Sequence, residues 1–113
     1  MTERHPRKVA YFCMEYGLDA SLTIYSGGLG VLAGDILKAN HDQERDLVAL
    51  GVFWDEGYTR QRLDELGQPR DDYEKTSREH LEPVDVSFSV EIRGELVPLR
   101  AWLLISSVLR GRV

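Results

Sequence analysis

The sequence predicts an α/β protein with a partial parallel sheet and a β-hairpin. Three observations support this fold class. Two short apolar segments, residues 9–14 and 47–54, have the composition of buried strands. A segment with helical spacing lies between them, and an alternating segment at residues 84–92 leads into a return strand. Two strands joined through a helix form a βαβ unit, which implies parallel pairing.

The two expected parallel strands are continuous apolar runs. Residues 9–14 and residues 47–54 are both bounded by polar or mixed sequence. Runs of this kind are typical of strands that are buried on both faces. Residues 15–26 are mixed in composition, and we expect them to form a long loop.

The expected helix covers residues 31–40, directly after a glycine-rich segment. Leu32 and Ile36 are four residues apart, as are Ala33 and Leu37, which is helical spacing with one apolar face. Gly34 disfavours a helix by up to about 1 kcal/mol relative to alanine. We therefore expect Gly34 to mark a close approach of another backbone segment.

The expected hairpin begins with apolar residues at every second position of the segment 84–92. This is the period of a half-buried strand. A turn at residues 93–95 and a return strand at 96–105 complete the hairpin. Pro98 places part of the return strand at an edge or a bulge. The polar residues 55–84 are expected to form loop and surface structure.

Composition limits the possible functions. The chain has 113 residues, a net charge of −5 and 42% hydrophobic residues, which suits one small domain or part of a larger one. The acidic balance argues against a nucleic-acid partner, and no apolar run is long enough to cross a membrane. The single Cys13 cannot form an internal disulfide, so we expect a cytoplasmic protein.

The most informative segment for function contains Gly27, Gly28, Leu29 and Gly30. Glycines let a backbone approach a ligand closely. A helix that follows them would direct free N–H groups and partial positive charge at an anion, so the four residues are candidate phosphate or substrate ligands. Their spacing is neither that of a P-loop nor that of a dinucleotide fingerprint. A tight turn without a ligand is the alternative interpretation.

Other polar residues are weaker candidates. Glu15 follows the first strand and could position a substrate, but we favour a supporting or surface carboxylate at this position. Tyr25 could line a cleft or pack in the core, and Asp35 is expected to interact with the dipole of a nearby helix start. The three histidines are scattered without ligand spacing, so no metal site is expected. We expect no catalytic residue in this segment.

Residues 9–18 together with residues 24–35 resemble the start of the bacterial α-glucan (glycogen and maltodextrin) phosphorylases. The resemblance continues at residues 47–52, at Gly57 and Tyr58, and at Gln61 and Trp102. It covers roughly residues 8–105 and concerns the N-terminal segment of that family only.

The resemblance implies a GT-B glycosyltransferase, in which two Rossmann-like domains face a cleft. Residues 1–113 would form part of the N-terminal domain, and the C-terminal cofactor domain would be absent. The family uses inorganic phosphate to release glucose 1-phosphate from α-1,4-glucan, and its full-length members can form homo-oligomers. The glycine segment would lie over the substrate phosphate, with the N–H groups of Gly28 and Leu29 in contact with it.

The family also uses pyridoxal 5′-phosphate, which a lysine of the second domain holds. Lys8, Lys38 and Lys75 are the lysines of this chain, and none lies in a segment that resembles the cofactor motif. The isolated chain is therefore expected to be inactive. Two alternatives stay open: a glycogen or starch synthase-type enzyme, and a truncated remnant that binds sugar or phosphate. Synthases place a lysine just before a similar glycine loop, where this sequence has Tyr25 and Ser26.

Overall fold

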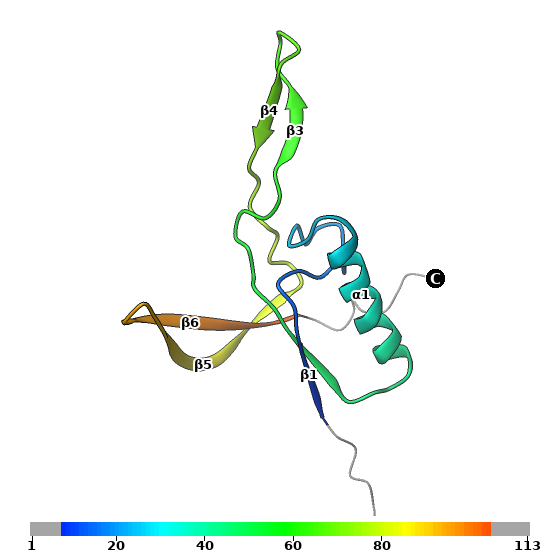
Figure 1. The fold of residues 1–113 in the computed structure, drawn as a ribbon, viewed down its shortest axis with the longest axis vertical. Helices are drawn as coiled ribbons and strands as arrows, with labels where there is room; N and C mark the ends of the chain where they lie inside the picture. Colours follow the sequence, from blue (N-terminus) through cyan, green and yellow to red (C-terminus); the bar gives the residue numbers. More distant parts are fainter. Residues whose placement is uncertain (1–7, 105–113) are drawn as a thin grey trace, which may run out of the picture.

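The computed structural model describes residues 8–104. These residues form, in order, β1 (Val9–Phe12), α1 (Gly27–Asp42), β2 (Leu47–Leu50), β3 (Arg60–Leu63), β4 (Pro69–Asp72), β5 (Leu81–Ile92) and β6 (Glu95–Leu104). Within this range the strands pair as β1 with β2, β3 with β4, and β5 with β6. Figure 1 shows the two hairpins leading away from the β1–α1–β2 unit in different directions.

The β1–α1–β2 unit confirms the expected parallel pair and the mixed α/β class. β1 and β2 run parallel, with Val9 opposite Leu47 and Phe12 opposite Leu50. Both strands end earlier than the apolar runs predicted, at Phe12 and Leu50. The expectation that they are buried on both faces was wrong, since Phe12 is 74% exposed and Leu50 is 45% exposed.

The reason lies in what covers the pair. Tyr11 and Leu47 pack against the buried cluster of Tyr16, Ala33 and Leu37, so one face meets α1. Phe12 and Leu50 point to the opposite face, because successive side chains of a strand alternate. Among residues 8–104 that face keeps much of its apolar surface exposed.

Helix α1 begins four residues earlier than expected. The prediction began the helix at Val31, after a glycine loop, whereas Gly27 to Gly30 form the first helical turn. Ser26 is the N-cap residue, in an extended conformation with φ of −146°. Glycine has a low intrinsic helix propensity, and a tertiary contact on this turn explains why the sequence pattern was misleading.

That contact is a close packing of the loop after β1 on α1. The N–H of Gly17 donates to the carbonyl oxygen of Gly30 at 2.7 Å. A Cβ at Gly34 would overlap the carbonyl group of Gly17. Gly30 and Gly34 lie four residues apart and therefore on one side of the helix. The expected close approach at Gly34 is confirmed, and Gly17 is the partner.

Tyr16 fastens the same loop to the strand ends. Its side chain is 5% exposed, and its hydroxyl lies 2.7 Å from the carbonyl oxygen of Tyr11 and 3.1 Å from that of Leu50. Gly51 leaves room for the ring, because a Cβ there would come within 2.8 Å of it. Loop, helix and both strands therefore meet at one residue.

The β5–β6 hairpin confirms the expected pair of antiparallel strands, although β5 begins at Leu81 rather than at residue 84. The expectation that this strand is half-buried was wrong, since Val86 and Phe88 are each 44% exposed. Residue 105, the last of the expected return strand, lies outside the described residues.

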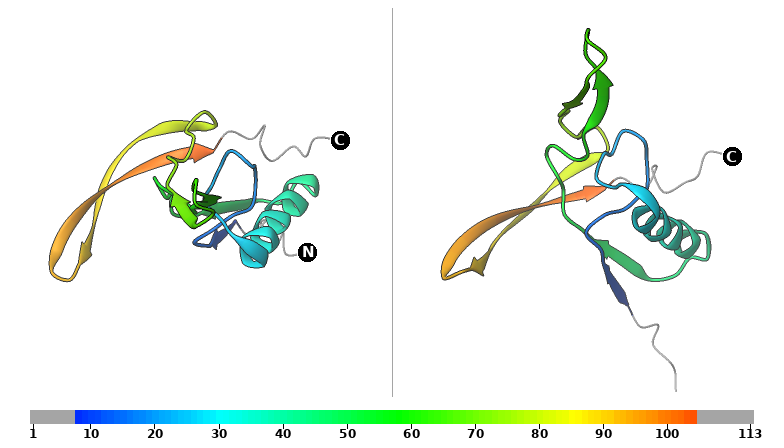
Figure 2. Two further views of the ribbon diagram at one scale, coloured as in Figure 1. Left: turned by 90° about the horizontal axis from the view of Figure 1, so that it is seen from above. Right: turned by 45° about the horizontal axis from the view of Figure 1, so that its top comes forward.

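Arg93 and Gly94 make the turn with φ values of 53° and 83°. Positive φ at both central residues is typical of the tight hairpin turn that matches strand twist. Pro98 lies opposite Ser89 in a two-stranded sheet, where it occupies an edge as expected. Figure 2 shows this long hairpin curving away from α1.

The β3–β4 hairpin was missed by the sequence analysis, which assigned residues 55–84 to loop and surface structure. Its strands lack an apolar alternation and consist largely of charged residues. Arg62 pairs with Asp72 at 3.0 Å and with Glu74 at 3.4 Å. The side chains of this hairpin are largely exposed, and ion pairs between the strands take the place of a buried apolar face.

A polar junction ties the bases of both hairpins to the rest of the chain. Asp55 accepts from Lys75 at 2.6 Å and from Arg78 at 3.1 Å. These partners hold the pKa of the Asp55 carboxyl below its ordinary value, with the Lys75 hydrogen bond as the main cause. The Arg78 guanidinium also lies 5.5 Å from the ring of Phe53 and 5.4 Å from the ring of Trp102, within the range of cation–π attraction.

The glycine contact predicts the effect of adding one methyl group to α1. Gly34→Ala should lower the free energy of unfolding by about 1–3 kcal/mol, because the new Cβ meets backbone that cannot rotate away. Gly28→Ala is the matched control, since nothing lies within 4 Å of its Cβ position. Urea unfolding followed by helical circular dichroism measures both. A Gly34→Ala variant as stable as Gly28→Ala would contradict the contact.

Burial of Tyr16 predicts a loss of stability at alkaline pH. Burial is the main cause that raises the pKa of Tyr16 from 10.0 to about 12. The folded chain therefore keeps this proton where the unfolded chain has released it, and its contribution is complete below pH 10 and is lost as the pH rises toward 12. Tyr16→Phe should remove this part of the pH dependence and cost about 1 kcal/mol at neutral pH. Equal alkaline slopes in the two proteins would refute the assignment.

Candidate functional site

The candidate site lies where β1 and β2 end and α1 begins. In open α/β sheets, ligands bind at the carboxyl ends of parallel strands. In this chain the ends of β1 and β2 border a shallow apolar hollow, lined by Phe12, Cys13, Met14, Leu50, Gly51 and Val52. The loop that leaves β1 leads directly to the first turn of α1 (Figure 1).

The first turn of α1 presents its backbone to solvent. Gly27, Gly28 and Leu29 are exposed, whereas Gly30 is buried. Ser26 makes no side-chain cap, and the first N–H groups of a helix have no partner within it. Gly27 has a φ of 69°, so the turn needs glycine there. Gly28 has open space around its Cβ position, so it leaves room for a ligand.

Glu15 lies in the loop after β1, and its side chain reaches the same turn. Its Oε2 accepts the N–H of Ser26 at 2.9 Å. The same oxygen lies 3.0 Å from the position that a Cβ of Gly30 would occupy. A carboxylate at a helix N-terminus is electrostatically favourable, and it places one negative charge beside the candidate anion site.

Tyr25 and Asp35, the other two candidate supporting residues, lie in different surroundings. Tyr25 is half-buried and packs over the two glycines Gly17 and Gly30, which agrees with the packing interpretation. Asp35 lies in the third turn of α1 and is exposed. The first turn of α1 contains no acidic residue, so the interpretation of Asp35 as a partner of the helix dipole was wrong. It failed because the helix begins at Gly27.

Trp54 lies beside the candidate site, whereas the sequence analysis placed it at the end of the expected buried strand, residues 47–54. Its indole N–H donates to the carbonyl oxygen of Met14 at 3.1 Å, at the carboxyl end of β1. Trp54 is 42% exposed and Met14 is 63% exposed. The apolar run 47–54 predicted a strand through Trp54, whereas β2 ends at Leu50. The sequence pattern therefore did not indicate that Trp54 lies beside the end of β1.

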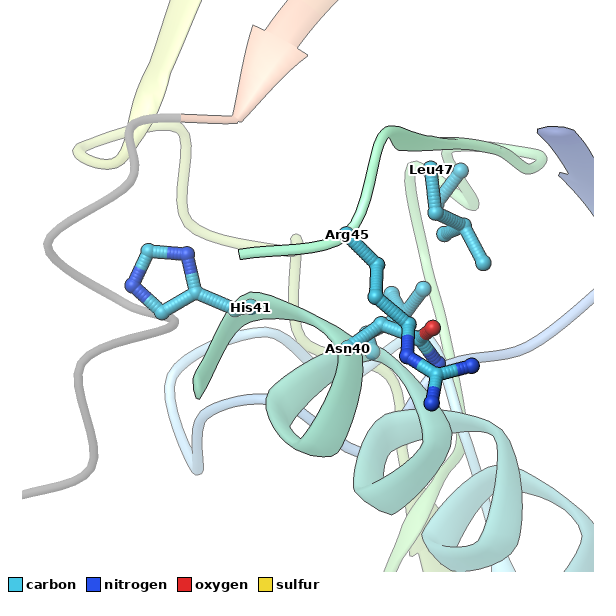
Figure 3. A pocket seen from close by; sticks show the side chains of 6 residues that line it. Asn40, His41, Arg45 and Leu47 are labelled. Carbon is cyan, nitrogen blue, oxygen red and sulfur yellow. The ribbon is translucent and has the colours of Figure 1, made fainter. Parts of the chain in front are cut away.

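A second hollow lies at the opposite end of α1. It is lined by Leu37, Asn40, His41, Arg45, Leu47 and Ala49. Figure 3 shows Arg45 and Asn40 close together, with the His41 ring turned away from them. His41 stands in the last helical turn, where basic groups face the partial negative charge of the free carbonyls. This end of the helix therefore disfavours anions, and the candidate site stays at the N-terminal end.

The ion pairs found within residues 8–104 lie in the segment from Asp55 to His80 and do not reach the α1 turn. The same residues contain no group of histidine, cysteine and carboxylate side chains that could hold a metal. No helix of this range is long and apolar enough to span a membrane.

Comparison with known proteins gives several relatives. The chain is 50% identical over 60 residues to a maltodextrin phosphorylase of Thermococcus litoralis, which covers 53% of this chain and 7% of the relative. It is 35% identical over 108 residues to a glycogen phosphorylase of Mycobacterium tuberculosis, which covers 96% of this chain and 12% of the relative. A glycogen phosphorylase of Aquifex aeolicus is 37% identical over 82 residues, 73% of this chain and 12% of the relative.

The chain is related to the glucan phosphorylases. The resemblance carried by the β1 and α1 motifs is thereby confirmed. The chain spans only 7% to 12% of the length of these phosphorylases. No family model matches the chain, and no solved structure does.

Proposed function

We propose that this chain is part of an α-glucan phosphorylase of the GT-B type. Residues 1–113 would contribute to a Rossmann-like N-terminal domain, and a second domain would carry the cofactor. The observation that supports the proposal is the joint arrangement of β1, the packed loop, the open first turn of α1 and parallel β2. This arrangement occurs in a chain similar to three named phosphorylases.

In this proposal the first turn of α1 binds the phosphate that attacks an α-1,4-glucan and leaves as glucose 1-phosphate. The N–H groups of Gly28 and Leu29 are the proposed donors, because both residues are exposed. Backbone donors fixed by a packed helix can stabilise charge without moving during the reaction. Gly27 supplies the left-handed backbone that shapes the turn, and Gly30 supplies the packing beneath it.

The energy available to this turn indicates why the isolated chain should be inactive. A helix N-terminus contributes up to about 2 kcal/mol to a favourable charge interaction. An affinity of about 1 mM corresponds to about 4 kcal/mol. The chain would therefore need further cationic groups from outside residues 8–104 to hold phosphate firmly.

The residues of this chain do not fit the pyridoxal 5′-phosphate of the phosphorylase family. Lys75 is engaged by Asp55, and Lys38 lies on α1 at a half-buried position. Lys8 is exposed before β1. None of the three lines either hollow described above. We therefore propose that the lysine that holds this cofactor belongs to another domain.

The synthase-type alternative is less well supported. Its glycine loop would follow a lysine, whereas Tyr25 and Ser26 precede Gly27 here, and Tyr25 packs on glycine. The named relatives among the matches cited above are phosphorylases. A non-catalytic remnant would have the same fold as a phosphorylase segment. Only a measurement of activity distinguishes the two.

Gly28→Val tests the proposed phosphate contact. The fold should tolerate valine, because the Cβ position is open and valine has a higher helix propensity than glycine. The branched side chain should cover the N–H groups of Gly28 and Leu29. Titration with inorganic phosphate at constant ionic strength, followed by amide chemical shifts, should show weak binding to the parent chain and its loss in Gly28→Val.

Ala39→Val adds similar bulk at an exposed position near the other end of α1 and is the control. It should bind phosphate as the parent chain does. Equal phosphate affinity in Gly28→Val and the parent chain would show that the first turn of α1 is not the phosphate site.

A segment exchange tests the wider proposal. The 60 matched residues of the Thermococcus litoralis maltodextrin phosphorylase would be replaced by those of this chain. We expect the chimaera to release glucose 1-phosphate from maltodextrin, and to lose this activity with Gly28→Val. A chimaera that melts like its parent enzyme but releases no glucose 1-phosphate would favour the remnant interpretation.

A further inference from the structure

We infer that Glu15 is a positioning residue that holds the first turn of α1 and lowers its affinity for anions. The inference rests on the proposed phosphate-binding role of that turn and adds a second function to it. Glu15 would thus act on the ligand through the backbone and through its charge, without forming a bond to the ligand.

The positioning part follows from the contacts of one oxygen. Glu15 Oε2 accepts the N–H of Ser26 at 2.9 Å. Ser26 directly precedes Gly27, whose φ is 69°. The carboxylate is half-buried and lies against Gly30. Its main chain is fixed as well, because the next residue, Tyr16, is buried and bridges the two strand ends. The geometry of the turn therefore depends on a side chain from the loop after β1.

The electrostatic part follows from the same position. A carboxylate that accepts the N-cap N–H lies within a few ångströms of the next N–H groups of the turn. Like charges repel each other, and they repel more strongly near a protein surface than in bulk water. An incoming phosphate would meet this negative charge. The lysine and arginine side chains that form ion pairs among residues 8–104 lie on other segments and are paired with other carboxylates. Glu15 would thus keep the turn ordered while it is empty and allow an anion to leave readily.

Two substitutions separate these roles. Glu15→Gln keeps an oxygen that can accept the Ser26 N–H and removes the charge, so phosphate should bind several-fold more tightly. Glu15→Ala removes both, so Ser26 should lose its protection from hydrogen exchange and phosphate affinity should gain less than in Glu15→Gln. Asp35→Asn is the control, since Asp35 is an exposed carboxylate on the same helix. It lies about 12 Å along the axis from the first turn, farther than the Debye length of about 8 Å.

The experiment uses amide hydrogen exchange of Ser26 and phosphate titration of each variant of this chain. Unchanged phosphate affinity in Glu15→Gln, with clear binding to the parent chain, would overturn the electrostatic part. Unchanged protection of Ser26 in Glu15→Ala would overturn the positioning part. If phosphate shifts the amides of no variant while Ser26 protection still depends on Glu15, the proposed function fails and the positioning of the turn stands.

Discussion

The described structure depends on a backbone-to-backbone contact between the loop after β1 and helix α1. Gly17 donates to Gly30 at 2.7 Å, and its carbonyl group occupies the space that a side chain at Gly34 would need. Because none of these residues has a side chain, the loop can lie directly on the helix. The contact holds the first turns of α1 against the loop, and so it helps to set where the N–H groups of the first turn point.

Tyr16 extends this constraint to the sheet. Its ring packs with Ala33 and Leu37, and its hydroxyl reaches the carbonyl oxygens of Tyr11 and Leu50. One side chain therefore sets the distance between the ends of β1 and β2 and the helix above them. Since the buried cluster is small, the loss of a single member should affect all of these parts together.

The sequence predicted the elements whose signals are local. The parallel pair, the helix and the β5–β6 hairpin follow from apolar runs, a period of 3.6 and a turn at Arg93 and Gly94. The sequence did not predict that α1 begins at Gly27, because glycines disfavour a helix and the packing of Gly30 on Gly17 involves residues distant in the sequence. The charged β3–β4 hairpin was not predicted either, because its strands have no apolar alternation. They are joined by cross-strand ion pairs such as that between Arg62 and Asp72. For the candidate site, the glycine segment was found, whereas the bond from Glu15 to Ser26 required the fold.

The glycines of the first turn have unequal physical roles, and this decides what a substitution can teach. Gly30 and Gly34 are required by packing, and Gly27 by its positive φ. Gly28 is required by none of these, since it is exposed and has free space around its Cβ position. A glycine that the fold does not need leaves space for a ligand to approach the backbone closely. Gly28 is therefore the position where loss of phosphate binding, with stability unchanged, separates a ligand site from a tight turn.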